Sequence, residues 1–162
     1  MSKILYTINI SGDSIGNNGF IMFLIEQFSR YQIPPRTICF EIRETAAIAN
    51  FERARYFTSQ LKKIACCLAL DDWGSRLSCF AYVMNLPVDY LKIDGALVKN
   101  ISHNLISQAL VEGFNRIAHA MNLETIAEFV EDETILEKLR EMGVDYAQGY
   151  GLAHPVPINF NR

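Results

Sequence analysis

The sequence has 162 residues, of which half are hydrophobic and 20% are charged, the balance of a globular domain with a buried core. This composition excludes a disordered chain, a collagen-like repeat and a small disulfide-built scaffold. The formal net charge is −3, and acidic and basic residues are mixed along the chain, so we expect no binding to DNA. No apolar run approaches the roughly 20 residues of a membrane-spanning helix, and the first residues lack a secretory signal pattern. We therefore expect a cytoplasmic protein with no membrane segment.

Short apolar runs alternate with helix-period segments along the whole chain, which favours repeated β-α units and a parallel sheet. The predicted strands, in chain order, are Ile4–Ile10, Thr37–Ile42, Cys66–Asp71, Tyr90–Asp94, Thr125–Glu128 and Tyr146–Gln148. The predicted helices are Phe20–Tyr31, Phe51–Ile64, a shorter segment near Ser78–Met84, Leu105–Met121 and Asp132–Met142. No linker or repeat interrupts this order, so we predict a single domain over residues 1–162.

A polar residue stands at or near the end of every predicted strand: Asn9, Glu41, Asp71, Lys92, Glu128 and Gln148. Strand side chains alternate between two faces, so the apolar neighbours of these residues point the other way. In a barrel of parallel strands, polar side chains at the carboxyl ends line the mouth, where such barrels place their chemistry. Taken singly, each residue is equally well explained as a solvated strand end or a helix cap.

The acidic residues and Asn9 suggest a metal site. Asn9, Glu41, Asp71 and Asp72 offer only oxygen ligands, which suit hard cations such as Mg²⁺ or Mn²⁺. Adjacent aspartates cannot both point inward from a regular strand. They can converge if the strand ends at Asp71 and the chain turns at Trp73-Gly74. The alternative is that the aspartate pair serves only as a turn or a helix cap.

Two further residues fit a site with two metal ions. Paired divalent ions activate a water molecule and hold the oxygens of a phosphodiester during in-line displacement. Lys92 then fits as a cation near that water or the phosphate, and Glu128 as a ligand of the second ion or a proton acceptor. The sequence thus suggests metal-assisted phosphodiester hydrolysis.

Six segments, taken together in their order and spacing, resemble the EAL-domain family of bacterial cyclic di-GMP phosphodiesterases. They are Ile8-Asn-Ile-Ser11, Phe40-Glu-Ile-Arg-Glu-Thr45, Leu70-Asp-Asp-Trp-Gly74, Leu86-Pro-Val-Asp-Tyr-Leu-Lys-Ile-Asp94, Ala127-Glu-Phe-Val-Glu131 and Gln148-Gly-Tyr150. The resemblance implies an α/β fold, a modified TIM-type (β/α) barrel truncated at its N-terminus to about six of eight strands. The family's first two strands and its Glu-Ala-Leu segment belong upstream of Asn9. We therefore expect a piece of a longer protein or a chain that another chain completes.

The resemblance also assigns roles to residues. It implies that Asn9, Glu41, Asp71 and Asp72 bind two Mg²⁺ or Mn²⁺ ions, and that Lys92, Glu128 and Gln148 organise the second ion and the attacking water. Glu44 resembles the family residue that anchors the loop after Asp72, and Glu131 the second acid of the segment that begins with Glu128. The implied substrate is cyclic di-GMP and the implied product is linear pGpG. The expected partners are a second copy in a homodimer or upstream domains of a longer chain.

Some positions depart from the family pattern. Trp73–Cys79 differs from the usual Phe-Gly-Thr-Gly-Tyr-Ser-Ser after the aspartate pair, Phe129 replaces a usual glycine, and Gly95 stands where the family often has an arginine. Three hypotheses follow. The chain belongs to a metal-dependent phosphodiesterase, to a degenerate EAL domain that senses cyclic di-GMP or binds a partner without hydrolysis, or to a structural barrel fragment with no ligand.

Overall fold

The computed structural model describes residues 5–74 and 84–157. All six predicted strands lie within a residue or two of their expected positions, and they form one sheet: β1 (Tyr6–Ile10), β2 (Ile38–Arg43), β3 (Cys67–Trp73), β4 (Tyr90–Ile93), β5 (Glu124–Ala127) and β6 (Tyr146–Ala147). Every neighbouring pair is parallel, and the order in the sheet is the order in the chain.

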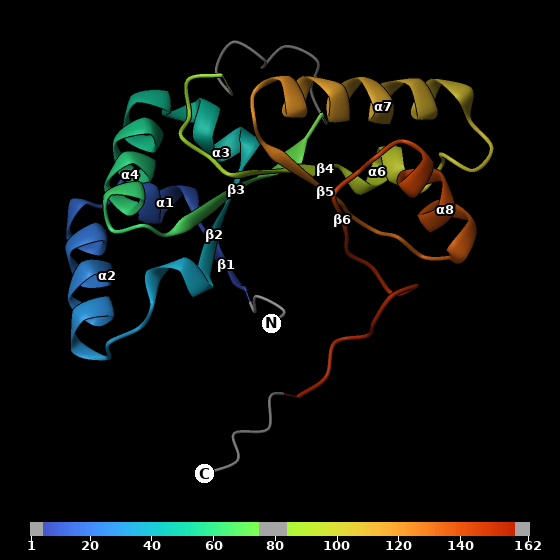
Figure 1. Cartoon of the computed structure of the whole chain (residues 1–162). Helices are drawn as coiled ribbons and strands as arrows, with labels where there is room; N and C mark the ends of the chain where they lie inside the picture. Colours follow the sequence, from blue (N-terminus) through green and yellow to red (C-terminus); the bar gives the residue numbers. More distant parts are fainter. Residues whose placement is uncertain (1–4, 75–83, 158–162) are drawn as a thin grey trace.

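The helices cover one face of this sheet, with α2 and α4 beside its first strands and α7 and α8 beside its last (Figure 1). The longer ones are α2 (Asn18–Arg30), α4 (Phe51–Lys63), α7 (Leu105–Ala120) and α8 (Glu133–Glu141). Short ones are α1 (Gly12–Ile15), η1 (Pro35–Thr37), α3 (Glu44–Ala49) and α6 (Gly95–Val98). The six parallel strands and their helices form an incomplete TIM-type (β/α) barrel, as predicted. The helix predicted near Ser78–Met84 falls mostly on residues 75–83, which lie outside the described residues.

Local sequence signals explain where the longer helices begin. Asn104 accepts hydrogen bonds from the backbone N–H groups of Ile106 and Ser107, which caps α7. Asp132 accepts one from the N–H of Ile135, which caps α8. Such side chains satisfy N–H groups that have no partner inside the first helical turn. Asp132 was predicted as the first helical residue and is instead the cap.

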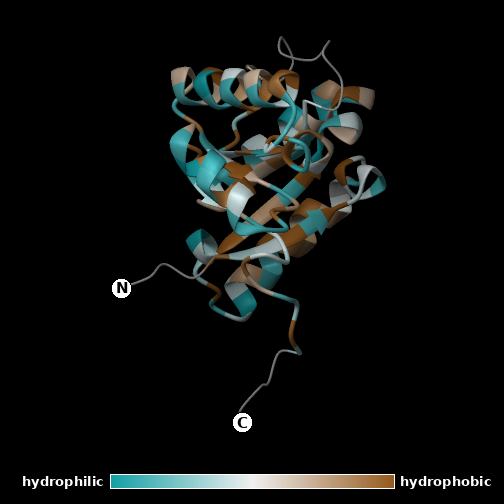
Figure 2. Ribbon diagram, turned by 90° about the vertical axis from the view of Figure 1, so that its right-hand side faces the viewer, coloured by the Kyte–Doolittle hydropathy of each residue, from teal (hydrophilic) through white to brown (hydrophobic). Residues whose placement is uncertain are grey.

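The strands separate two sets of side chains, as their alternation predicts. The large core lies between the strands and the helices, and Phe40, Leu70 and Leu91 contribute to it. A smaller apolar cluster on the opposite face contains Cys39, Ala69 and Tyr90. In Figure 2 the strands are mostly brown, whereas the helices alternate brown and teal. Burial of both faces of the central strands leaves their carboxyl ends as the places where polar groups gather.

A polar network ties α7 to the last two strands. Asp145 Oδ2 lies 2.8 Å from His119 Nε2 and accepts a hydrogen bond from the backbone N–H of Thr125 at 2.7 Å. Thr125 Oγ1 donates to Asn115 Oδ1 at 2.6 Å. Burial alone would raise the pKa of Asp145, but the hydrogen bonds from Thr125 and His119 outweigh it and lower that pKa.

We therefore expect Asp145→Asn to lower the free energy of unfolding by about 1–2 kcal/mol near neutral pH. Because the pKa is lowered in the folded protein, this stabilisation is present above the ordinary value of 3.8 and is lost as the pH falls through the folded-state pKa. Thermal unfolding from about pH 7 to about pH 3 should show that the difference in Tm between the variant and the wild type becomes smaller in acid. A difference that stays constant with pH would contradict this assignment.

The described helices include none with the length and apolar character needed to cross a bilayer.

Candidate functional site

A buried lysine lies at the centre of the strand ends. Lys92 Nζ on β4 is 2.9 Å from Glu41 Oε2, 3.2 Å from Asp71 Oδ1 and 2.7 Å from Glu128 Oε1. Its side chain is only 4% exposed. Three carboxylates from three separate segments, two from strands and one from the residue after β5, thus share one ammonium group. The structure therefore brings Glu41, Asp71, Lys92 and Glu128 together at one end of the sheet, and their catalytic and metal-binding roles stay predictions.

Asp72 joins this cluster by a route that differs from the prediction. The strand does not end at Asp71, because β3 continues to Trp73. Asp72 instead has a left-handed backbone with φ of 59°, and the pairing of β3 with β4 shifts register between Leu70 and Trp73. This irregularity interrupts the regular alternation of strand side chains at Asp72. As a result, carboxylate oxygens of Asp71, Asp72 and Glu128 lie within 4.8 Å of one another.

Asn9 and Gln148 flank the cluster on opposite sides. Asn9 on β1 is the register partner of Glu41 and lines a cavity of about 600 Å³ together with Arg43. Gln148 follows β6 and borders a cavity of about 310 Å³ beside Glu128. Both residues are exposed. They lie next to the cluster, at the edges of the sheet that carries it.

Glu44 and Glu131 have surroundings of their own. Glu44 is the first residue of α3 and is 2% exposed. Its predicted partner, the loop after Asp72, falls mainly on residues 75–83, outside the described part of the chain. Glu131 is exposed and pairs with Lys99 at 3.2 Å, and it lines the same cavity as Gln148. Both roles therefore stay predictions.

Arg43 is a neighbour that the sequence analysis missed. Its Nε lies 3.7 Å from Asp72 Oδ2, and its side chain is exposed. Arg43 stands two residues after Glu41 on β2, so strand alternation places both on one face. That spacing was the signal that could have identified Arg43 as a cation near the acids.

The charges of the cluster shift the pKa values of its members. Burial raises the pKa of Glu128, and Asp71 and Asp72 add to this effect, which outweighs the opposing attraction of Lys92. Burial and the nearby Asp71 likewise raise the pKa of Asp72, with Arg43 acting against them. For Lys92, burial alone would lower the pKa, but hydrogen bonds to Glu128 and Glu41 outweigh it and raise that pKa well above 10.5. Lys92 is therefore charged at any physiological pH.

The site has the properties that a divalent cation requires. Four carboxylates, those of Glu41, Asp71, Asp72 and Glu128, gather near one buried ammonium. Asp71 Oδ1 is buried and, among the described residues, has no hydrogen-bond partner of good geometry. Its contact with Lys92 is one of charge only. Oxygen donors of this kind suit hard cations, so the acidic cluster fits a divalent metal ion.

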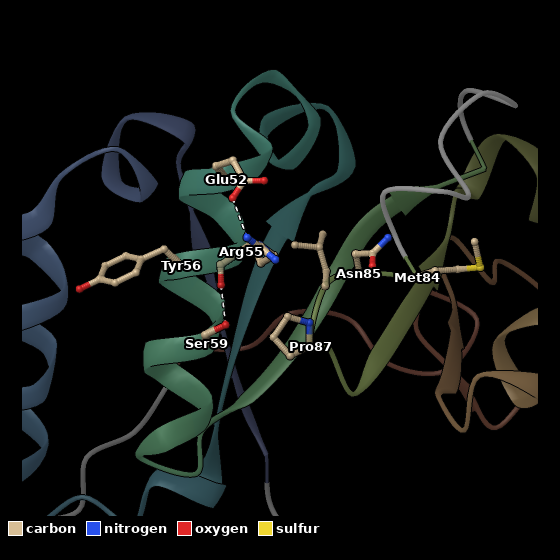
Figure 3. A pocket seen from close by; sticks show the side chains of 8 residues that line it. Glu52, Arg55, Tyr56, Ser59, Met84, Asn85 and Pro87 are labelled. Carbon is tan, nitrogen blue, oxygen red and sulfur yellow. Dashed lines mark hydrogen bonds and ion pairs between the residues drawn. The ribbon is translucent and has the colours of Figure 1, made fainter.

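A further cavity lies away from the carboxylate cluster. It has a volume of about 710 Å³ and lies between α4 and the segment before β4, where Tyr56 and Pro87 contribute to its lining (Figure 3). Arg55 on this wall pairs with Glu52 at 2.8 Å. No member of the carboxylate cluster contributes to it, so the size of a cavity does not identify the chemistry here.

Parallel strands in barrel order, with acids and a lysine at their carboxyl ends, define an α/β barrel protein whose mouth carries an acidic cluster. Residues 2–155 match the EAL domain family. The chain therefore belongs to the EAL-domain family.

Two curated relatives are cyclic di-GMP phosphodiesterases by name. PdeB of Shewanella oneidensis is 41% identical over 152 residues, which cover 94% of this chain and 18% of that protein. PdeA of Borreliella burgdorferi is 40% identical over 154 residues, or 95% of this chain and 23% of that protein. The chain thus spans about a fifth of the length of these relatives.

Solved structures agree with the fold. The FimX EAL domain from Pseudomonas aeruginosa, bound to c-di-GMP, superposes with a TM-score of 0.89 at 27% identity. The match covers 93% of this chain and 62% of that one.

Proposed function

We propose that this chain supplies most of the catalytic centre of a cyclic di-GMP phosphodiesterase that produces linear pGpG with Mg²⁺ or Mn²⁺. One observation carries the proposal: four carboxylates converge around a single buried ammonium at the carboxyl ends of parallel strands. The names of the two curated relatives and the ligand of the FimX domain support the choice of substrate.

Within this proposal, Asp71, Asp72 and Glu128 hold two metal ions together with Glu41 and Asn9. Such ions, when bound, provide a nucleophilic water and offset the charge of the phosphodiester. Oxygen ligands from separate strands give the site the several carboxylates that such ions need.

The other residues act by position and charge. Lys92 orients Glu41 and Glu128 through its contacts of 2.9 and 2.7 Å, and its raised pKa keeps it cationic beside the phosphate. Gln148 borders the cavity next to Glu128, where its amide can orient a water molecule. The chain covers 62% of the FimX domain, and we further propose that a second copy of the chain or further domains contribute to the pocket.

A second candidate function is binding of cyclic di-GMP without hydrolysis. The contacts of Lys92 favour it, because this ammonium already contacts three of the four acids. In such a sensor the same strand ends would bind the nucleotide, and turnover would be absent.

The experiment is turnover of cyclic di-GMP by the purified chain with Mn²⁺, with the linear product followed by chromatography. We expect product from the wild type, in which a second copy of the chain completes the pocket, and none from Asp71→Asn, because that change removes a charged ligand from the buried end of β3. Glu137→Gln, an exposed position on α8, is the matched control and should keep full activity. Equal turnover by Asp71→Asn would refute the two-metal assignment. Binding of cyclic di-GMP by equilibrium dialysis without any product would favour the sensor.

A further inference from the structure

Two positions that depart from the family pattern lie in contact with each other. Gly95 begins α6 and is buried, and Phe129, which is 54% exposed, follows Glu128 after β5. A Cβ atom added to Gly95 would lie 2.0 Å from Cδ2, 2.6 Å from Cγ and 2.9 Å from Cβ of Phe129. Because the last of these atoms is fixed to the backbone, rotation of the ring alone cannot relieve the overlap. Position 95 therefore tolerates only glycine while the ring of Phe129 stays in place.

Phe129 has a backbone conformation that its residue type rarely adopts. Its φ is 53°, in the left-handed region that suits glycine and is strained for a bulky side chain. Such a conformation persists only where the surroundings enforce it. Here the ring lies against Gly95. Lys99 Nζ lies 4.6 Å from the ring centroid and also forms an ion pair with Glu131.

The backbone on both sides of Phe129 is held by hydrogen bonds. The N–H of Glu128 donates to the carbonyl of Ile93 at 3.3 Å, and the N–H of Val130 donates to the carbonyl of Gln148 at 3.1 Å. The turn at Phe129 is therefore held by backbone hydrogen bonds on both sides. Glu128, directly before this turn, points its carboxylate at Lys92 with a distance of 2.7 Å.

We propose that Phe129 is a positioning residue, and that its ring, seated on Gly95 beneath Lys99, fixes the turn that holds Glu128 on the carboxylate cluster. Gly95 and Phe129 thus form a matched pair in which each requires the other. The proposal rests on the proposed function in one respect, which is that Glu128 binds a metal ion.

The first experiment measures Mn²⁺ affinity by electron paramagnetic resonance in the wild type, Gly95→Ala, Phe129→Ala and the double variant. We expect Gly95→Ala to weaken Mn²⁺ binding by about 10- to 100-fold, as loss of a supporting contact behind a ligand does. In the Phe129→Ala background the same change should weaken Mn²⁺ binding much less than in the wild type, because the overlaps with the ring are gone and only the 2.9 Å contact with the Cβ of position 129 remains. Gly113→Ala on α7, where an added Cβ meets nothing within 4 Å, is the matched control and should bind like the wild type.

Conservative replacement separates positioning from general packing. Phe129→Tyr keeps the ring and should keep wild-type Mn²⁺ affinity, whereas Phe129→Ala should not. This comparison also decides the matter if Gly95→Ala does not fold. A Gly95→Ala protein with a lower Tm and unchanged Mn²⁺ affinity, or Phe129→Ala with unchanged affinity, would overturn the proposal.

A second experiment separates this inference from the proposed function. In the metal-free protein, Phe129→Ala and Glu128→Gln are combined in a double-mutant cycle of thermal unfolding. If the ring holds Glu128 on Lys92, the Tm loss of the double variant is smaller than the sum of the two single losses. Additive losses would overturn the positioning role. A wild type that binds no Mn²⁺ would count against the proposed function, and this cycle would still decide the role of Phe129.

Discussion

Replacement of Lys92 by methionine is expected to lower the free energy of unfolding of the metal-free chain by about 3–5 kcal/mol. Methionine fills a similar volume but leaves Glu41, Asp71 and Glu128 without the positive charge that offsets their mutual repulsion. Those carboxylates are at most 13% exposed, so water compensates little of the lost attraction. Because the pKa of Lys92 is raised in the folded protein, its contribution is fully present below its ordinary value of 10.5 and is lost only at higher pH.

Urea unfolding of the wild type and Lys92→Met measures this loss. Lys138→Met is the control, because Lys138 pairs with Glu141 on the surface of α8, where its side chain is 38% exposed, and such pairs contribute about 1 kcal/mol or less. Added Mn²⁺ should restore part of the stability of Lys92→Met, since it returns positive charge to the acids. Equal stability of Lys92→Met and the wild type would show that the acids are not held together by this lysine.

Alanine at position 149 should be similarly damaging, for a steric reason. A Cβ on Gly149 would lie 2.2 Å from the carbonyl oxygen and 2.3 Å from the nitrogen of Val130. Both are backbone atoms, so no side chain can move aside, and the adjoining strand must shift. We expect a loss of about 3 kcal/mol, which corresponds to a fall in Tm of roughly 6–12 °C for a domain of this size. Gln148 should move away from Glu128 in the same variant.

Thermal unfolding of Gly149→Ala beside Gly113→Ala provides the comparison. Gly113 lies within α7 with open space around it, so alanine there should raise stability by about 0.5–1 kcal/mol. The two variants add the same methyl group to the same residue type, and differ only in what that group meets. A Gly149→Ala protein that unfolds at the wild-type temperature would show that β6 is free to shift at no cost.

Much of the architecture could be predicted because the strands carry strong local signals. Apolar runs bounded by turns gave all six strands in order, and alternation placed Glu41, Asp71 and Lys92 on one face. The short helices α1, α3 and α6 were missed, since segments of 4 to 6 residues are too short to show a helical period.

The two left-handed residues of the site could not be predicted from local preference. Aspartate is tolerated in this conformation, but nothing nearby marks Asp72 rather than Asp71 as the residue that adopts it. Phenylalanine favours strands, so its own preference argues against the turn at Phe129. In both cases tertiary packing decides the backbone, and it is these turns that bring Asp72 and Glu128 together.

The sheet order gives the site a gradient of rigidity. Lys92, Glu41 and Asp71 lie on strands that pair with neighbours on both sides, whereas β1 and β6 each pair with a single strand among the described residues. β6 is only two residues long. Local opening begins where few contacts oppose it. In a hydrogen-exchange measurement, the backbone N–H groups of Gln148 and Asn9 should therefore exchange well before those of the central strands. The charged cluster would then stay in place while the two strand ends that carry Asn9 and Gln148 repeatedly open and close.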